Sequence, residues 1–493
     1  MMSTRAAVLD RLAQETWDVL VIGGGATGLG AALNAVTRGY RTLLLEQSDF
    51  AKATSSRSTK LIHGGVRYLQ QGNISLVRES LHERGLLLRE AAAFVRPLEF
   101  VIPARSWGQK LYYGAGLKAY DLLAGRLGMQ PSRLLSRKET QYRIPTIKQS
   151  VFTGGVSYFD AQFDDARLAV ALAATINARG GTAVNYVRVQ SFLKQNGRVS
   201  GVEAVDGETG EVSRISARAV INATGIFSDE VRCLDNPASK PTLVLSQGAH
   251  LVVDRSFLPG EAAVIVPQTD DGRVLFLIPW LGATLIGTTD LPVKHALLEP
   301  RPLHQEIEFL MEHASRYLET SIQRTDLRSC FAGLRPLVKS SSTSTTARLS
   351  RDHVIHTSGS GLVSISGGKW TTFRRMGADV VTVAIRSAGL PVRNVSPERL
   401  ELIEDQMAPD LGTREIALPT DDFIRHCYRV LQARTVEDVL ARRSRLLFLH
   451  AEQAVGHAPH VARVLAEERH EDEHWIASQV EEFRETSQAY FPV

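Results

Sequence analysis

The sequence predicts an α/β fold with a Rossmann-type nucleotide-binding domain, an antiparallel-sheet domain and a helical C-terminal domain. A glycine-rich strand–turn–helix pattern opens the chain, short apolar strands with hairpin turns fill residues 241–350, and a charged, helical composition begins near residue 401. We expect residues 1–240 and 351–400 to form the nucleotide-binding domain, 241–350 the antiparallel domain and 401–493 the helical domain.

Length and composition limit the class of protein. The chain has 493 residues, which is too long for a single ordinary hydrophobic core, so we expect two or three domains. Of these residues, 44% are hydrophobic and 22% are charged. This composition is typical of a globular protein and not of a disordered one. The formal net charge of +4 is compatible with an anionic substrate or an anionic membrane surface, but it argues for neither. No basic arm for nucleic acid is present, so we expect no nucleic-acid partner.

The cysteines and the N-terminal residues indicate the compartment. Cys233, Cys330 and Cys427 are far apart, which excludes a disulfide framework and a CxxC metal site and favours a reducing compartment. We therefore expect no metal. The N-terminus has no signal-peptide pattern. Residues 19–37 carry no charge and approach membrane-spanning length, but their glycine spacing favours strand, turn and helix over a transmembrane segment.

Residues 17–47 carry a dinucleotide-binding pattern. An apolar strand enters Gly23-x-Gly25-x-x-Gly28, an alanine-rich helix follows, and a second apolar strand ends on Glu46. Gly23 allows a tight turn, Gly25 lets the backbone approach a pyrophosphate, and Gly28 lets the helix pack on the strand. The helix N-terminus favours phosphate, and Glu46 is spaced to bind a ribose hydroxyl. The pattern alone does not separate NAD from FAD.

Two further features favour FAD as the cofactor. A nucleotide motif at the extreme N-terminus of a chain of nearly 500 residues is usual for FAD enzymes. Residues 218–229 form an apolar strand pattern that runs into an Asn-Ala-Thr-Gly turn, which resembles the turn that closes over the flavin nucleotide in such folds. Before it, Asn196-Gly197 and Asp206-Gly207 predict hairpins that interrupt the parallel sheet.

A set of motifs in order resembles the FAD-dependent, quinone-linked glycerol-3-phosphate dehydrogenases, a family with a D-amino-acid-oxidase-like fold. The most specific are KLIHGGVRYL at 60–69 and GGKWTT at 367–372, accompanied by FDDARL, NATGIFSD, GAHLVV, IGTTD, GLRPL and SRDH. The resemblance covers essentially the whole chain. It implies a flavoenzyme that oxidises sn-glycerol 3-phosphate to dihydroxyacetone phosphate by hydride transfer to FAD N5 and passes electrons to ubiquinone or menaquinone.

The resemblance also implies cofactor contacts beyond the first motif. The stretch 54–65 would run along the flavin, and the helix after residues 366–372 would direct its N-terminal amides at the flavin's pyrimidine edge. Arg57 receives no role. The expected contacts are Ser55, Ser56, Lys60, Gly64, Gly65, Thr224, Gly225, Gly368 and Thr371.

Oxidation of a phosphorylated alcohol needs an anchor for the phosphate and a base for the hydroxyl proton. Arginine and lysine suit a dianion, and histidine is the natural base near neutral pH. For the base, His250 and His63 are alternatives, and arginine-assisted proton loss is also open. By resemblance, the catalytic residues are His250, Arg335, Lys369 and His63, and Arg67, Tyr68 and Arg351 bind the substrate.

Membrane contact is expected from residues 105–128, which mix Trp107 and three tyrosines with lysine and arginine. Such a helix suits an interfacial anchor, although an ordinary helix half-buried against the flavin domain fits the pattern equally well. We expect a peripheral protein on the cytoplasmic face of the inner (plasma) membrane, otherwise cytoplasmic, with a homodimer possible.

The rival functions use the same fold. One is an oxygen-dependent α-glycerophosphate oxidase, although no long insertion follows the GTTDLP stretch as it does in those oxidases. Another is a flavin amino-acid or amine oxidase, and a third is a flavin-binding protein without activity. The absence of a mitochondrial presequence pattern and of a calcium-binding loop pattern favours a bacterial-type respiratory enzyme.

Overall fold

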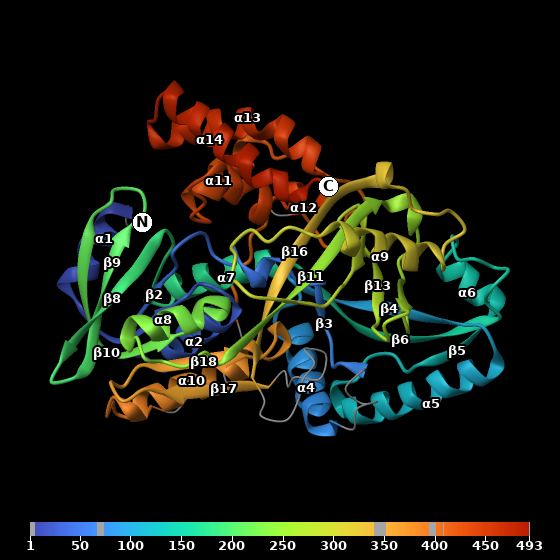
Figure 1. The fold of residues 1–493 in the computed structure, drawn as a ribbon, viewed down its shortest axis with the longest axis horizontal. Coiled ribbons are helices and arrows are strands. Elements are labelled where there is room, and N and C mark those ends of the chain that lie inside the picture. Colours follow the sequence, from blue (N-terminus) through green and yellow to red (C-terminus); the bar gives the residue numbers. More distant parts are fainter. Residues whose placement is uncertain (1–4, 67–72, 340–351, 394–400, 408, 493) are drawn as a thin grey trace.

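The computed structural model describes residues 5–66, 73–339, 352–393, 401–407 and 409–492. It contains two sheets and a group of C-terminal helices, in agreement with the predicted α/β class (Figure 1). In Figure 1 the first sheet lies at the left, the second at the right, and the C-terminal helices at the top. None of the helices in the described ranges combines the length and the apolar character needed to cross a bilayer.

The first sheet has eight strands and carries the nucleotide-binding pattern. Its path runs β17-β18-β10-β1-β2-β7, and β9 and β8 extend it from β10. The centre is parallel, β9 and β8 pair antiparallel, as the predicted hairpins require, and β17 pairs antiparallel with β18 at the other edge. The strands are β1 Thr16–Ile22, β2 Thr42–Leu45, β7 Thr182–Val184, β8 Val187–Gln195, β9 Arg198–Asp206, β10 Val212–Asn222, β17 His353–Thr357 and β18 Val363–Gly367.

Helices cover this sheet, among them the two that the sequence pattern indicated after Gly28 and after residues 366–372. Asp164 caps the first turn of α7 by accepting a hydrogen bond from the Arg167 amide, as expected for an aspartate before an alanine-rich helix. A Cβ at Gly377 in α10 would lie 2.4 Å from the backbone of Gly30, so glycine allows α10 to touch α2. The helices are α1 Arg5–Gln14, α2 Ala26–Thr37, α7 Asp165–Ala178, α8 Ser228–Asp235 and α10 Phe373–Ser387.

The second sheet has ten strands in the order β15-β11-β14-β13-β12-β4-β6-β3, with β16 on β11 and β5 on β6. All of its pairings are antiparallel except β12 with β4. The later strands are β11 Leu243–Asp254, β12 Ala263–Val266, β13 Leu275–Trp280, β14 Ala283–Gly287, β15 Leu291–Val293 and β16 Leu327–Val338.

Residues 61–163 supply the remaining four strands of this sheet, although the sequence assigned all of 1–240 to the nucleotide-binding domain. Local patterns identify a strand but not its distant partner, and β4 pairs with β12 far along the chain. The strands are β3 Leu61–Ile62, β4 Val95–Ala104, β5 Arg133–Ser136 and β6 Gly154–Phe163. The helices around the sheet are α4 Ile74–Glu90, α5 Trp107–Ala124, α6 Arg137–Arg143 and α9 His304–Ser315.

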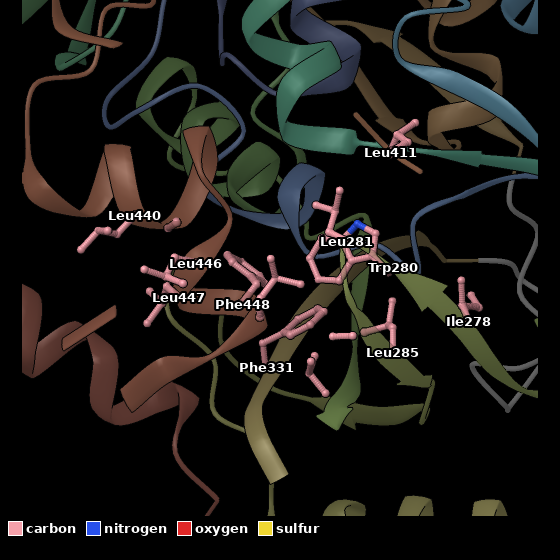
Figure 2. Packing of buried hydrophobic residues seen from close by; sticks show 14 of the residues in the cluster. Ile278, Trp280, Leu281, Leu285, Phe331, Leu411, Leu440, Leu446, Leu447 and Phe448 are labelled. Atoms are coloured by element: carbon pink, nitrogen blue, oxygen red, sulfur yellow. The ribbon is translucent and has the colours of Figure 1, made fainter. Parts of the chain in front are cut away.

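The C-terminal helices share a core with the second sheet. Phe448 points toward Trp280 and Phe331 of that sheet, as Figure 2 shows, and Leu446 and Leu447 belong to the same buried cluster. Because these side chains are buried together, the helices are part of the same packed body as the sheet. The elements are α11 Asp421–Arg429, the π-helical turn Asp438–Arg443, α12 Leu446–Leu449, α13 Ala451–Arg469 and α14 Glu473–Ser487.

Candidate active site

Two adjoining cavities lie where the two sheets meet. One has a volume of about 180 Å³ and is lined in part by the nucleotide-binding pattern. The other has a volume of about 600 Å³ and is lined by strands of the second sheet, by α5 and by the chain segments after β2, β3 and β18. They share a wall made of Thr54, Pro336, Gly368, Lys369 and Trp370. We call them the nucleotide cavity and the substrate cavity. A long cofactor can therefore occupy the first and extend its reactive end toward the second.

The nucleotide cavity is shaped by backbone conformation. Gly23 has φ +109°, and a Cβ there would lie 2.7 Å from the Ala223 carbonyl oxygen. A Cβ at Gly28 would lie 1.8 Å from the Gly23 carbonyl oxygen. Both positions therefore require glycine, as the motif predicted. Gly23, Gly25, Glu46, Thr224 and Gly225 line the cavity, and Gly28 lies beneath its turn.

Glu46 is fixed at the end of β2 by two backbone amides. The Gly24 amide donates to Oε2 at 2.6 Å and the Ser48 amide donates to Oε1 at 2.9 Å. Burial raises the pKa of Glu46, and these two hydrogen bonds oppose that rise. A carboxylate held this way can accept hydrogen bonds from the hydroxyls of a dinucleotide ribose, and the amides of the glycine turn and the helix N-terminus can donate to its pyrophosphate. These residues fit FAD.

The segment after β2 divides the predicted cofactor residues into two groups. Ser55 lines the nucleotide cavity, where its Oγ accepts from the Ala26 amide at 3.0 Å and its carbonyl accepts from Trp370 Nε1 at 2.8 Å. Ser56 and Lys60 are buried and belong to the lining of neither cavity. Lys60 Nζ instead donates to the Ser56 carbonyl at 2.6 Å and to Asp165 at 2.7 Å.

The substrate cavity brings together residues from distant parts of the chain. His63 and Gly65 follow β3, His250 lies on β11, Arg335 on β16, and Lys369 follows β18. Gly368 and Thr371 line the same cavity. The predicted substrate residues Arg67, Tyr68 and Arg351 lie outside the described residues.

His250 is buried in the cavity wall, and two contacts fix its imidazole ring. Its Nε2 is hydrogen-bonded to Thr59 Oγ1 at 2.9 Å, and the ring stacks on Phe331 with centroids 4.8 Å apart. Burial, and then the positive charges of Lys60 and Arg335, lower the pKa of His250 well below 6.5. The imidazole is therefore neutral near pH 7 and able to accept a proton.

Two cations face the cavity from different elements. The Arg335 Nη2 donates to Thr288 Oγ1 at 3.0 Å, and a Cβ at Gly248 would lie 2.2 Å from the same Nη2, so only glycine on β11 leaves room for it. The Lys369 Nζ donates to Ser80 Oγ of α4 at 2.6 Å. Both cations are thus oriented by hydroxyl oxygens, and Arg335 Nη1 also lies 3.9 Å from Asp290 Oδ1.

The glycine pair after His63, Gly64 and Gly65, lies next to a buried polar cluster that the sequence patterns did not indicate. Asp160 accepts from Arg84 Nη1 at 2.8 Å, from the Tyr120 hydroxyl at 2.8 Å and from the Gly64 amide at 3.4 Å. Burial raises the pKa of Asp160, against the opposing charge of Arg84. A Cβ at Gly64 would lie 2.4 Å from the Tyr120 hydroxyl oxygen. The cluster therefore fixes the turn that borders the cavity.

Helix α5 contributes to the cavity and to the surface. Tyr112, Tyr113 and Leu117 line the cavity together with an apolar group that includes Phe100, Ile102, Tyr158, Ile265 and Phe276. Other parts of the helix are open to solvent: Trp107 is 66% exposed and Leu122 is 82% exposed. The helix is thus half-buried and also presents large apolar side chains outward.

Comparison with known proteins places this geometry in a family. The sequence matches the FAD dependent oxidoreductase family over residues 18–374. It is 36% identical to the mitochondrial glycerol-3-phosphate dehydrogenase of Macaca fascicularis, over 97% of this chain and 74% of that protein.

Solved structures agree with the sequence comparison. The glycerol-3-phosphate dehydrogenase of Bacillus halodurans, solved with FAD, superimposes with a TM-score of 0.79 at 27% identity, over 99% of this chain and 98% of that one. The L-alpha-glycerophosphate oxidase of Mycoplasma pneumoniae has a TM-score of 0.61 at 18% identity, over 78% and 98% of the two chains, and shows the shared fold alone. The nucleotide motif, the fit to FAD and these relatives lead to one conclusion: the chain belongs to the FAD-dependent glycerol-3-phosphate dehydrogenases.

Proposed function

We propose that this protein oxidises sn-glycerol 3-phosphate to dihydroxyacetone phosphate and passes the electrons through FAD to a membrane quinone. The observation that carries the proposal is the convergence of Arg335 and Lys369 with a neutral His250 in one cavity beside the nucleotide cavity. Two cations suit a phosphate dianion, and a neutral imidazole suits an alcohol proton. An amino-acid oxidase would instead need a site for an α-carboxylate and an amine.

Substrate binding would rest on Arg335 and Lys369. Their hydroxyl partners, Thr288 and Ser80, hold the cationic groups in place before substrate arrives, so little side-chain freedom is lost on binding. Arg67, Tyr68 and Arg351 are proposed to complete the phosphate site on the basis of the family motifs alone. With the phosphate anchored, the carbinol carbon would point toward the wall shared by the two cavities.

The proton would go to the His250 imidazole. Its Nε2 is hydrogen-bonded to the cavity-lining Thr59, which fixes the orientation of the ring, and the ring is neutral near pH 7. His63 lines the same cavity and is the alternative base. When bound, FAD supplies a hydride acceptor at N5. The buried surroundings of His250 keep bulk water from competing for the proton.

The quinone acceptor is supported by the apolar part of the substrate cavity. A glycerol phosphate is polar and gains nothing from a wall of Phe100, Ile102, Ile265 and Phe276, whereas a lipid-soluble ring would bury apolar surface there. Helix α5 borders this wall and also carries the exposed side chains of Trp107, Leu122 and the cation Lys118. We propose peripheral contact of α5 with the cytoplasmic face of the plasma membrane.

Anaerobic reduction of the purified holoenzyme tests the reaction. Addition of sn-glycerol 3-phosphate should bleach the oxidised flavin absorbance, while glycerol at the same concentration should not, because it lacks the anchoring phosphate. Equal bleaching by both compounds would refute the phosphate site. No bleaching by either in a protein with bound FAD would refute the proposed reaction.

The acceptor is tested separately. With substrate and a short-chain ubiquinone analogue, the enzyme should reduce the quinone, and in air without quinone it should form little hydrogen peroxide. Stoichiometric peroxide at the rate of substrate oxidation would instead identify the oxygen-dependent oxidase. Sedimentation with vesicles of anionic phospholipid, compared with neutral vesicles, tests the membrane contact.

A further inference from the structure

The segment that follows β2, residues 47–60, has two faces. Gln47, Lys52, Ala53, Thr54 and Ser55 line the nucleotide cavity. On the other face, Asp49, Ser56 and Lys60 are almost fully buried. That second face is covered by the C-terminal residues 437–449, which reach it with three buried arginines: Arg442, Arg443 and Arg445.

Asp49 is the first point of contact. Arg443 forms a two-pronged pair with it, Nη1 to Oδ2 at 2.6 Å and Nη2 to Oδ1 at 2.9 Å, and Arg442 Nε also donates to Oδ2. Burial acts to raise the pKa of Asp49, but the charges of Arg443 and Arg442 outweigh it and lower the pKa. Asp49 lies three residues after Glu46, so this pair fixes the chain directly beyond the proposed ribose ligand.

The Ser56 carbonyl is the second point of contact. It accepts from Arg445 Nη2 at 3.2 Å and from Lys60 Nζ at 2.6 Å. Both cations also bind Asp165 at the start of α7, Arg445 at 2.9 Å and Lys60 at 2.7 Å. Ser55, the residue before this carbonyl, bonds the N-terminal turn of α2. A buried cation from the C-terminal region thus holds the peptide next to a cofactor-lining residue.

Aromatic rings exclude water from this cluster. The Arg445 guanidinium lies 4.6 Å from the Phe448 ring centroid and 5.4 Å from that of Trp280, and Lys60 Nζ lies 5.4 Å from that of Phe331. Figure 2 shows Phe448, Trp280 and Phe331 pointing toward one another between the C-terminal helix and the second sheet. Ion pairs enclosed in this way are weakly screened, and loss of one partner is costly.

We propose that Arg445, with Arg442 and Arg443, positions segment 47–60 for FAD, so that cofactor affinity depends on docking of the C-terminal helices. These arginines are positioning residues, because their contacts reach the cofactor segment from the side opposite the nucleotide cavity. Linkage requires the converse as well: bound FAD stabilises the docked C-terminal segment. The proposal goes beyond the proposed reaction, since FAD affinity is measured without substrate.

The test compares Arg445→Met with Arg429→Met. Arg429 lies in the same C-terminal region but pairs with Glu468 on the surface, where its side chain is 62% exposed. Apoprotein of each variant is titrated with FAD, and quenching of flavin fluorescence gives the dissociation constant. Arg445→Met should weaken FAD binding by about tenfold or more, the size of one lost charge-assisted hydrogen bond, with Arg445→Lys between it and wild type. Arg429→Met should bind as wild type does.

A folded Arg445→Met protein with unchanged FAD affinity, or an equal loss in Arg429→Met, would overturn the proposal. If Arg445→Met does not fold, hydrogen exchange on the wild-type chain decides. Addition of FAD to the apoprotein should slow amide exchange in residues 437–449 as well as in 47–60. Slowing confined to 47–60 would overturn the proposal. Neither readout depends on glycerol 3-phosphate oxidation, so failure of the proposed reaction would be seen separately.

Discussion

The nucleotide cavity and the substrate cavity share a wall but are built in different ways. The first combines the glycine turn and helix N-terminus after β1 with one carboxylate held by backbone amides, and backbone turns after β10 and β18 complete its lining. The second is made from side chains on β11, β16 and the turns after β3 and β18. The difference indicates that cofactor binding depends on backbone shape, whereas substrate chemistry depends on how the second sheet is assembled. Substitutions in the nucleotide cavity should therefore reduce FAD binding, whereas substitutions in the substrate cavity should leave FAD bound and impair substrate binding or oxidation.

The largest effect is expected from Gly28→Ala on the nucleotide side. The new methyl group would lie 1.8 Å from the Gly23 carbonyl oxygen, so α2 must move away from the turn. We expect the variant to be isolated with little or no bound FAD, and hence without activity. The flavin-to-protein absorbance ratio measures this, with Gly116→Ala on α5, where a Cβ meets nothing within 4 Å, as the control. Full FAD content in Gly28→Ala would contradict the claim that FAD binding depends on the backbone shape of the nucleotide cavity.

His250→Asn tests the substrate side. FAD should stay bound, while the rate of anaerobic flavin reduction should fall by about 10²- to 10⁴-fold, the usual contribution of a general base. Stopped-flow absorbance measures the rate at saturating substrate. His63→Asn is the matched variant, since His63 lines the same cavity. A larger loss in His63→Asn than in His250→Asn would transfer the role of base to His63.

The pH dependence of reduction sharpens this assignment. Because burial and the charges of Lys60 and Arg335 lower the pKa of His250 below 6.5, the ring is already deprotonated at pH 7. The reduction rate should therefore not fall between pH 8 and pH 7, and it should decrease only on further acidification, as the ring takes up a proton. A decline that begins above pH 7 would contradict a lowered pKa at the base.

The smallest effect is expected from Tyr120→Phe on α5. The substitution removes one hydrogen bond to Asp160, and Asp160 keeps those from Arg84 and the Gly64 amide. Loss of a single buried hydrogen bond should lower the free energy of unfolding by about 1–3 kcal/mol. Denaturant unfolding of the holoenzyme measures this change. A change below about 0.5 kcal/mol would mean that the hydroxyl contributes little to fixing the turn.

The sequence predicted the residues of the nucleotide cavity better than those of the substrate cavity, because local spacing is visible in a sequence and long-range strand pairing is not. Gly23, Gly25 and Glu46 could be placed from spacing alone, because they lie on one continuous strand–turn–helix–strand unit. His250, Arg335 and Lys369 carry no such spacing, and only the family motifs suggested that they would meet. Their convergence depends on long-range pairing, such as that of β11 with β16.

Other features could not be predicted because they depend on local backbone direction or on distant partners. Ser56 and Lys60 follow Ser55 closely, but a short 3₁₀ turn and the positive φ of Lys60, +62°, direct them away from both cavities. Arg57 had no assigned role, yet its side chain is 1% exposed and pairs with Glu299 at 2.5 Å. The pairing of β4 with β12 likewise had no signal in the sequence.

The separation of the two cavities is tested most directly by anaerobic titration of FAD-loaded Arg335→Met with glycerol 3-phosphate. Arg335 lines the substrate cavity and not the nucleotide cavity. We predict one FAD per chain, as in wild type, and a half-bleaching substrate concentration raised by about 30-fold or more, as for a lost charged contact to phosphate. Loss of FAD together with bleaching, or half-bleaching at the wild-type concentration, would contradict the division between cofactor binding and substrate recognition.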